Sequence, residues 1–262
     1  MTPQGPRAGV FTRLPAYVAA AAGLPASARL ADDVCGAVAV IPGSGNWWAG
    51  LLDARDQGAA AVVIADPEAL PREVFAAGTW SGGIPVVVER PGLRADMVAD
   101  AVRARRGTLP RVVTVECAAP AALLDAVIRD GLGWARSLAG SPLTLRAGVA
   151  AAQGTMALLD SPVAGGSRLP SSMVGTVLEG PAAGGLLQVL AMGEVRTEVA
   201  IDHAAGWAKL ETSTAEGALT APERYEARAR LALAGVFAAA LLVMPGPARA
   251  SAVQPGWSGV DQ

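Results

Sequence analysis

Histidine, lysine and cysteine are almost absent from this chain of 262 residues, which has one histidine (His203), one lysine (Lys209) and two cysteines (Cys35 and Cys117). These counts exclude a histidine-rich metal centre, a four-cysteine zinc site and a framework of several disulfides. Charged residues make up only 17% of the chain, and the formal net charge is -2. A broad nucleic-acid-binding surface would need a strong excess of positive charge. We therefore expect neither a metal cofactor nor a nucleic-acid partner.

Apolar residues, by contrast, make up 52% of the chain. That composition excludes a disordered protein, and the length allows one large domain or two small ones. The longest apolar run, residues 231–244, is shorter than the ~20 residues that a membrane-spanning helix needs. We expect it to pack as a helix against a sheet, and the N-terminal residues do not resemble a signal peptide. These features predict a cytoplasmic protein without membrane attachment, in which both cysteines are buried and reduced.

The first half of the chain alternates apolar runs with helical segments. Four short runs have the composition of strands buried on both faces, at residues 37–41, 60–65, 84–88 and 111–116. Helices are expected before and between them, at residues 7–24, 47–57, 70–77 and 93–105. Such alternation predicts right-handed βαβ units around a parallel sheet. Residues 1–118 are therefore predicted to form a truncated Rossmann-like α/β domain.

The second half has a different pattern. A long helix is expected at residues 121–138, and segments with strand character follow it, at residues 143–159, 173–178, 186–192, 196–201 and 207–213. A closing helix over residues 222–243 is predicted from Thr220 as N-cap and Glu223 at the capping-box position. Residues 119–262 are thus predicted to form an α+β domain with an open antiparallel sheet. The alternating apolar residues of that sheet need cover, so we expect it to make an oligomer contact.

Residues 61–91 carry a more specific pattern, AVVIADPEALPREVFAAGTWSGGIPVVVERP. A strand ends near Pro67, a helix follows, and the next strand ends in Glu89-Arg90-Pro91. This segment resembles the Gfo/Idh/MocA family of glucose–fructose oxidoreductases and inositol dehydrogenases, in which the second strand ends in Glu-Lys-Pro. The resemblance implies a Rossmann-like domain that binds NAD or NADP, followed by an open antiparallel sheet for substrate and oligomer contacts.

The cofactor motif of that family is only partly present. The family binds the dinucleotide with Gly-x-Gly-x-x-Gly after its first strand, because glycines let backbone N–H groups approach the pyrophosphate. No strand pattern precedes the N-terminal glycines, so the family's first strand is predicted to be missing. The other candidate is Gly43-Ser44-Gly45, which follows a strand and precedes a helix, although Trp48 replaces the third glycine. The candidate cofactor-binding residues are Gly43, Gly45, Asp66 and Glu89.

The catalytic positions also depart from the family. Its Glu-Lys-Pro lysine bonds the substrate hydroxyl, but the residue here is Arg90, which stays protonated. Its catalytic histidine ends an Asp-x-x-x-His pattern on a helix, where this chain has Arg129 or Asp130 after Asp125. Arg90 and Asp130 are the candidate catalytic residues, although either aspartate could instead be an exposed carboxylate. His203 is not expected to replace the missing histidine, because it lies at a strand end beside a turn.

Two further features have competing interpretations. Trp47, Trp48 and Trp80 either cover a ligand pocket at the ends of the parallel strands or pack in the core. The basic cluster at residues 103–106 is expected to lie in solvent at a helix end, where positive charge is favourable.

Two functional readings follow from the resemblance and its departures. In the first, the chain keeps the fold without hydride transfer and acts as a binding or assembly subunit, paired through its sheet with a second copy or a complete homologous subunit. In the second, it is an active NAD(P)-dependent oxidoreductase acting on a small hydroxylated or imine substrate. That enzyme would use Gly43, Gly45 and Asp66 on the cofactor, with Arg90 and Asp130 at the substrate. The sequence does not choose a substrate.

Overall fold

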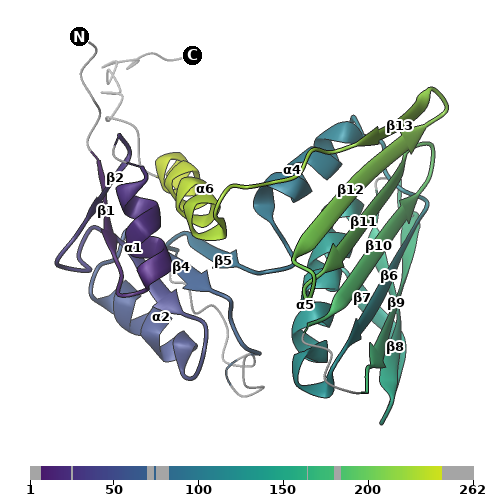
Figure 1. The fold of residues 1–262 in the computed structure, drawn as a ribbon, viewed down its shortest axis with the longest axis horizontal. Coiled ribbons are helices and arrows are strands. Elements are labelled where there is room, and N and C mark those ends of the chain that lie inside the picture. The colour runs from purple at the N-terminus through teal and green to yellow at the C-terminus, as the bar shows by residue number, and fades with distance from the viewer. Residues whose placement is uncertain are drawn as a thin grey trace, which may run out of the picture.

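The computed structural model describes residues 7–24, 26–69, 74, 83–163, 165–179 and 184–243. The chain forms two sheets, which lie on opposite sides of the molecule (Figure 1). The predicted combination of a parallel Rossmann-like sheet with a second, largely antiparallel sheet is confirmed. The predicted helix at residues 70–77, apart from Val74, lies outside the described residues, as do Trp80 and the segment after residue 243.

Five short strands form the parallel sheet, in the order β2-β1-β3-β4-β5. They are β1 (Ala8–Phe11), β2 (Ala28–Leu30), β3 (Val38–Pro42), β4 (Ala61–Ala65) and β5 (Val86–Glu89). The side chains of β4 are buried on both faces, which explains why this strand is continuously apolar. One face is covered by α1 (Pro15–Ala22) and α6 (Arg228–Val243), and the other by α2 (Trp47–Asp56).

The strand β1 corrects the prediction of a single helix over residues 7–24. It pairs in parallel with both β2 and β3, so it lies inside the sheet. The helix begins only at Pro15, because proline fixes φ for a first helical turn and keeps the preceding Leu14 extended, with ψ of 120°. The first strand that the family resemblance requires is therefore present.

Eight strands form the second sheet, in the order β13-β12-β11-β10-β6-β9-β8-β7. They are β6 (Val112–Ala119), β7 (Thr144–Ala151), β8 (Gly154–Pro162), β9 (Arg168–Val177), β10 (Leu186–Met192), β11 (Arg196–Asp202), β12 (Trp207–Thr214) and β13 (Gly217–Thr220). Neighbours run antiparallel except β6 and β9, which are parallel. The run predicted as a fourth strand of the parallel sheet is β6, so that assignment was wrong. Buried residues alternate along β6 because only one face of this sheet is covered.

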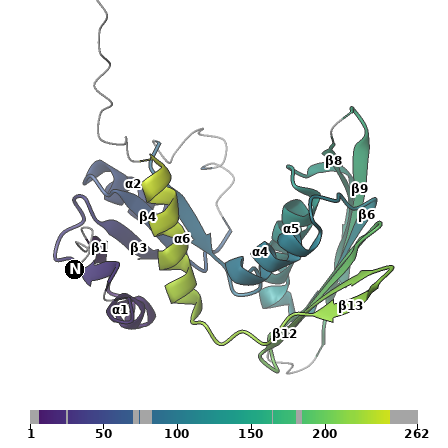
Figure 2. The same cartoon turned by 90° about the horizontal axis from the view of Figure 1, so that it is seen from above.

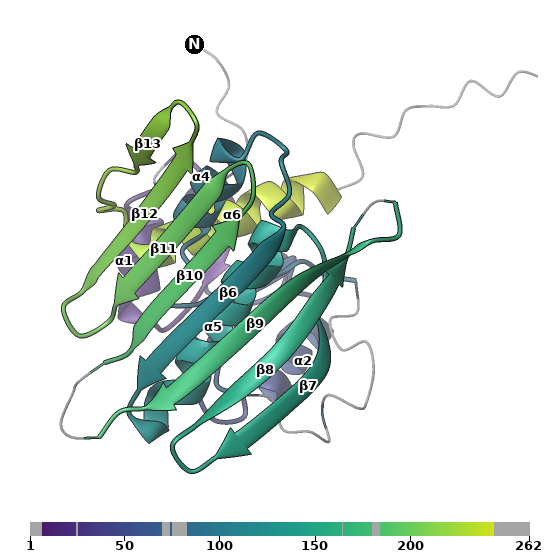
Figure 3. The ribbon, with the colours of Figure 1, turned by 90° about the vertical axis from the view of Figure 1, so that its right-hand side faces the viewer.

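Helices α4 (Ala95–Ala104) and α5 (Ala121–Ala139) cover one face of the second sheet, on the side toward the parallel sheet (Figure 2). Trp134 of α5 is completely buried in this layer. On the opposite face, none of the described helices lies over the strands (Figure 3). The second sheet is therefore open on one side.

The closing helix begins later than the capping-box pattern predicted. Thr220 ends β13, residues 221–227 cross back toward the parallel sheet, and α6 begins at Arg228. The ion pair of Arg224 with Asp100 of α4 holds this crossing to the second sheet's helix layer. From there α6 packs against β4 and β5, as expected for an apolar helix beside a sheet. Within the described ranges, no helix combines the length and apolar character needed to cross a membrane.

Candidate functional site

The two predicted catalytic residues, Arg90 and Asp130, contact each other at the junction of the two sheets. Arg90 directly follows β5, whereas Asp130 stands on α5. The Arg90 Nε lies 2.6 Å from Asp130 Oδ1, and the backbone N–H of Gly92 donates to Asp130 Oδ2 at 2.8 Å. Further along α5, the indole N–H of Trp134 donates to the Gly92 oxygen at 2.7 Å. The segment that leaves the parallel sheet is thus bonded to α5 by these three contacts and by a longer one, from the Arg90 guanidinium to the Ala126 oxygen at 3.4 Å.

This arrangement leaves little acid–base capacity in the pair. Asp130 is 3% exposed, so of the two candidate aspartates only Asp125 is an exposed helix carboxylate. Both oxygens of Asp130 accept N–H groups of the protein, one from the Arg90 guanidinium and one from the Gly92 backbone. The Nε–H of Arg90 is in turn used on this carboxylate. The pair holds the segment in place but does not offer a ready proton donor or acceptor to a ligand.

His203, which was not predicted to belong to the site, completes the cluster. A Cβ added at Gly92 would stand 2.6 Å from Asp130 Oδ2 and 3.1 Å from His203 Nε2. Both groups therefore lie against one point of the backbone, and only glycine leaves room for them. The Nε2 atom is buried and has no hydrogen-bond partner within the part of the chain that the structure describes. The backbone N–H of His203 donates to the oxygen of Gly185 at 2.9 Å, so a long-range pairing places the imidazole here.

Charged groups crowd the carboxyl ends of β4 and β5. Asp66 follows β4 with a positive φ of 49°, and burial, reinforced by the charge of Asp130, raises its pKa. Burial also raises the pKa of Glu89, although Arg228, 3.1 Å away, offsets part of this effect. On α1, burial and the charge of Glu89 raise the pKa of the Tyr17 hydroxyl. The predicted cofactor residues Asp66 and Glu89 therefore belong to the same charged cluster as Asp130.

The predicted cofactor glycines lie in a loop that the protein fills with its own groups. A Cβ at Gly43 would stand 2.3 Å from the Cα of Pro67, so this glycine allows two loops to pack together. Its N–H donates to the Ala65 oxygen, and its own oxygen accepts the Glu68 N–H, both at 2.8 Å. The N–H of Gly45, which has φ of +63°, lies 3.3 Å from the Glu68 carboxylate. That carboxylate occupies a donor that a phosphate would need, and its negative charge would repel one.

The turn after β1 is the other place for a pyrophosphate, because the strand order reverses between β1 and β3. This turn is Thr12-Arg13-Leu14; it contains no glycine and leads into Pro15, which has no N–H. The N–H of Leu14 already donates to the Thr12 hydroxyl at 3.1 Å. The residues at neither turn fit the pyrophosphate of a bound dinucleotide.

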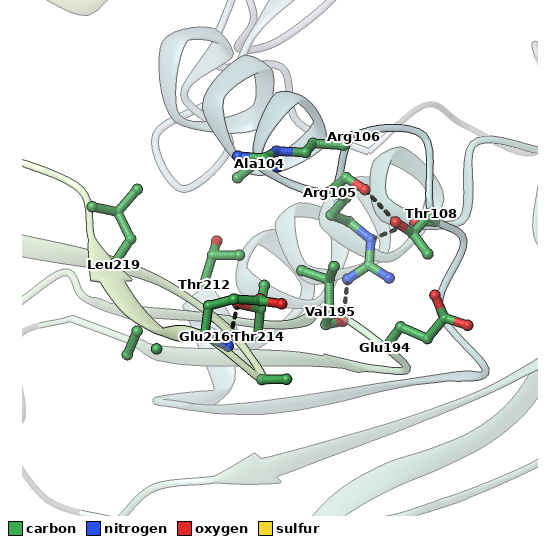
Figure 4. Close-up of a pocket in the computed structure, with 13 residues that line it drawn as sticks. Ala104, Arg105, Arg106, Thr108, Glu194, Val195, Thr212, Thr214, Glu216 and Leu219 are labelled. Carbon is green, nitrogen blue, oxygen red and sulfur yellow. Dashed lines mark hydrogen bonds between the residues drawn. The ribbon is translucent and has the colours of Figure 1, made fainter.

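The basic cluster at residues 103–106 was predicted to lie in solvent, and Arg105 contradicts this (Figure 4). Only 3% of Arg105 is exposed, because its guanidinium donates to the backbone oxygens of Thr108 and Val195 and to the hydroxyl of Thr197. It lines a pocket of about 800 Å³ between the end of α4 and the β12–β13 hairpin. Burial lowers the pKa of Arg105. Its bonds fasten α4 to the second sheet.

The remaining sequence candidates separate into core and surface. Trp47 is buried and Trp48 packs against the same cluster, which supports core packing. Cys117 is buried as predicted, but Cys35 is exposed, so the prediction of two buried thiols was wrong. Cys35 lies in the loop between β2 and β3 and not on a strand. In the described parts of the chain, no group of three or more His, Cys, Asp or Glu side chains is placed to hold a metal ion.

Comparison with known proteins relates this architecture to oxidoreductases. No protein-family model matches the sequence, and no curated protein matches it. UDP-N-acetylglucosamine 3-dehydrogenase GnnA from Acidithiobacillus ferrooxidans is 18% identical with a TM-score of 0.53, over 90% of this chain and 95% of its own. An oxidoreductase from Sinorhizobium meliloti is 12% identical with a TM-score of 0.63, over 90% and 88%. KijD10, a 3-ketoreductase from Actinomadura kijaniata solved with TDP-benzene and NADP, is 12% identical with a TM-score of 0.54, over 92% and 91%. This chain has the two-sheet fold of these enzymes.

Proposed function

We propose that this chain is a non-catalytic relative of NAD(P)-dependent oxidoreductases of the Gfo/Idh/MocA type and serves as a binding or assembly subunit. The buried ion pair of Arg90 with Asp130 carries the proposal. Arg90 stands where the resemblance places a catalytic lysine, and Asp130 is one of the two residues, with Arg129, that stand near the place of its catalytic histidine. Each satisfies the other, so the inherited acid–base groups now have a structural role.

The cofactor side supports the same conclusion. KijD10, whose fold is similar to that of this chain, was solved with NADP. In this chain the Glu68 carboxylate holds the N–H of Gly45, and the turn before Pro15 offers no glycine. A dinucleotide would have to displace these internal bonds and bring its phosphates beside a carboxylate. We therefore propose that NAD and NADP binding has been lost.

The open face of the second sheet supports the assembly role. Large apolar side chains remain 48% to 53% exposed there, on Met156, Leu158, Leu186 and Trp207. Exposed apolar surface of this kind marks contact sites between proteins. We propose that a second copy of this chain pairs with it through this sheet in the cytoplasm, and a complete homologous subunit is the alternative partner.

A titration with NADH and with NADPH, up to about 1 mM, tests the loss of the cofactor. A ligand that binds only the folded state adds about 2.7 kcal/mol of stability at 100 times its Kd, so binding would raise the melting temperature. We expect no saturable change in nicotinamide fluorescence and no thermal shift with either dinucleotide. Light scattering of the same samples should show a dimer.

The competing function is an active oxidoreductase, and His203 is the observation in its favour. Its buried Nε2, unpartnered among the described residues, lies beside Asp130 and so restores a histidine to the junction. Saturable cofactor binding that Asp66→Ala weakens, and that Asp53→Ala on the exposed surface of α2 leaves unchanged, would overturn the proposed loss of the cofactor and favour this alternative. Both substitutions remove one carboxylate, and Asp66→Asn, which tolerates the positive φ of this position, repeats the test without added backbone strain.

A further inference from the structure

The edge strand β7 is exposed along its whole length. It pairs with β8 on one side only, and all eight of its residues are exposed. Figure 3 shows it at the border of the eight-stranded sheet, away from α5. An edge strand carries a row of unpaired N–H and C=O groups on its outer side, and these can pair with another strand. The unpaired backbone groups of β7 are therefore suited to bind another β-strand.

Proteins usually carry features that block strand pairing at such an edge, and β7 lacks effective ones. Residues 147–151 contain no charge and no proline, which are the common means of blocking an edge. The strand has one charge, Arg146, beside the irregularity between Leu145 and Ala147. Its Nε lies 2.7 Å from Asp160 Oδ2 of β8, so it is bound to its own sheet. The other sheet edges, β2, β5 and β13, have only three or four residues each.

The side chains beside this edge form apolar rows that run out to it. Val149 lies opposite Met156 of β8, which lies opposite Val174 of β9, so the three share one row on the open face. Val149 is 65% exposed and Met156 is 49% exposed. A strand added beside β7 would extend this row and remove part of both side chains from water.

We propose that β7 pairs antiparallel with β7 of a second copy, so that two eight-stranded sheets join into one. The inference rests on the proposed assembly function and places the contact between two copies at the edge of the sheet, beside its open face. With the two-fold axis at Val149, each Val149 faces its copy and Ala147 faces Ala151. Arg146 then lies opposite Ala152, so no like charges meet. An antiparallel pair of identical strands is self-complementary and closes at two subunits.

Val149→Asp tests the pairing, because it places two carboxylates directly opposite each other across the axis. Leu219→Asp is the matched control, since Leu219 is 69% exposed on β13, the opposite edge of the same sheet. By light scattering and sedimentation we expect a dimer for the unmodified chain and for Leu219→Asp. The dimer dissociation constant of Val149→Asp should rise by at least about tenfold. Circular dichroism and the melting temperature of each variant, measured at low concentration, report whether it folds.

Cysteine cross-linking gives an independent measurement. In a Cys35→Ser background, Val149→Cys should form a disulfide-linked dimer on mild oxidation, because directly opposed Cβ atoms lie within reach of a disulfide. Leu219→Cys in the same background should not. Cross-linking of Leu219→Cys but not of Val149→Cys would overturn the pairing.

The remaining outcomes separate the edge from the assembly role. If Val149→Asp stays dimeric while Leu186→Asp on the open face becomes monomeric, the edge inference is wrong and the assembly role stands. If the unmodified chain is monomeric at about 100 μM, both the edge inference and the proposed pairing of two copies are overturned.

Discussion

The exposed borders of the two sheets differ in whether their backbone hydrogen-bonding groups are already used within the protein. At the carboxyl edge of the parallel sheet, where α/β folds commonly bind ligands, the protein's own groups fill the loops. The N–H of Gly43 bonds Ala65, the N–H of Glu68 bonds Gly43, and the Glu68 carboxylate reaches Gly45. At the border of the second sheet, β7 is exposed on all eight residues and has no charge between Ala147 and Ala151.

The contrast bears on the proposed loss of cofactor binding. A backbone N–H that bonds a neighbouring loop is no longer available to a phosphate, so each internal bond at the first edge makes cofactor binding less favourable. A sheet edge loses its ability to pair only when charge, proline or cover is added, and β7 has none of these in residues 147–151. The ligand edge is closed while the pairing edge stays open, and this difference favours an assembly role.

The largest effect is expected at the junction that links the two regions. Asp130→Ala would leave Arg90 as an uncompensated charge with a side chain only 15% exposed, and would leave the Gly92 N–H without its acceptor. Removing one partner of a buried ion pair costs about 3–5 kcal/mol. Urea unfolding should show a loss of this size for Asp130→Ala.

Asp125→Ala on the same helix is the matched control. Asp125 is exposed, and exposed substitutions usually change stability by less than about 0.5 kcal/mol. Equal losses for the two variants would show that the ion pair does not hold the junction.

A smaller, pH-dependent effect is expected at the closed edge. Burial and the charge of Asp130 raise the pKa of Asp66, so its folded state binds a proton more readily than its unfolded state. The stability that comes from the protonated form is present at low pH and is lost as the pH rises through the folded pKa. Asp66→Asn removes this loss and keeps a residue that tolerates positive φ. The variant should therefore exceed the unmodified chain in urea midpoint at pH 7, and by less at pH 4.

Asp53→Asn provides the comparison, because Asp53 is an exposed carboxylate on α2. A gain for Asp66→Asn that is equally large at pH 4 and pH 7 would point to relief of backbone strain and not to the buried charge.

Most of the fold was predictable from periodicity, and the failures have physical causes. Strands β3, β4 and β5 were found because continuous apolar runs are typical of parallel strands. The strand β1 was missed because its four residues lie close to Pro15, and the apolar run that contains Pro15 resembles a helix. The sheet to which β6 belongs depends on pairing with β9 and β10, residues 50 or more positions away, which composition does not encode.

The residues of the candidate site could be predicted one by one, but the contacts between them could not. The resemblance singled out Arg90 and Asp130 separately, and their bond depends on the packing of α5 against the segment after β5. His203 was set aside because a strand end beside a turn gives no sequence signal of what lies opposite it. One local signal of these contacts was Gly92, the glycine after Glu89-Arg90-Pro91. Because glycine has no side chain, the Asp130 and His203 side chains can approach its backbone closely.

The smallest effect is expected at the open edge. Arg146 and Arg168 both bond Asp160, and these bonds lower the pKa of Asp160 to about 2, so the carboxylate stays ionised at neutral pH. Asp160→Asn would release two positive side chains beside β7 and give the strand a guard that it lacks. Interactions between exposed charges are weak and screened by salt, so the dimer dissociation constant should rise only a few-fold, and less at high salt. Glu216→Gln makes the same charge change at the far hairpin and should leave dimerisation unchanged. If both variants weaken the dimer equally, the effect comes from net charge. Asp160 would then have no specific role in keeping β7 available for pairing.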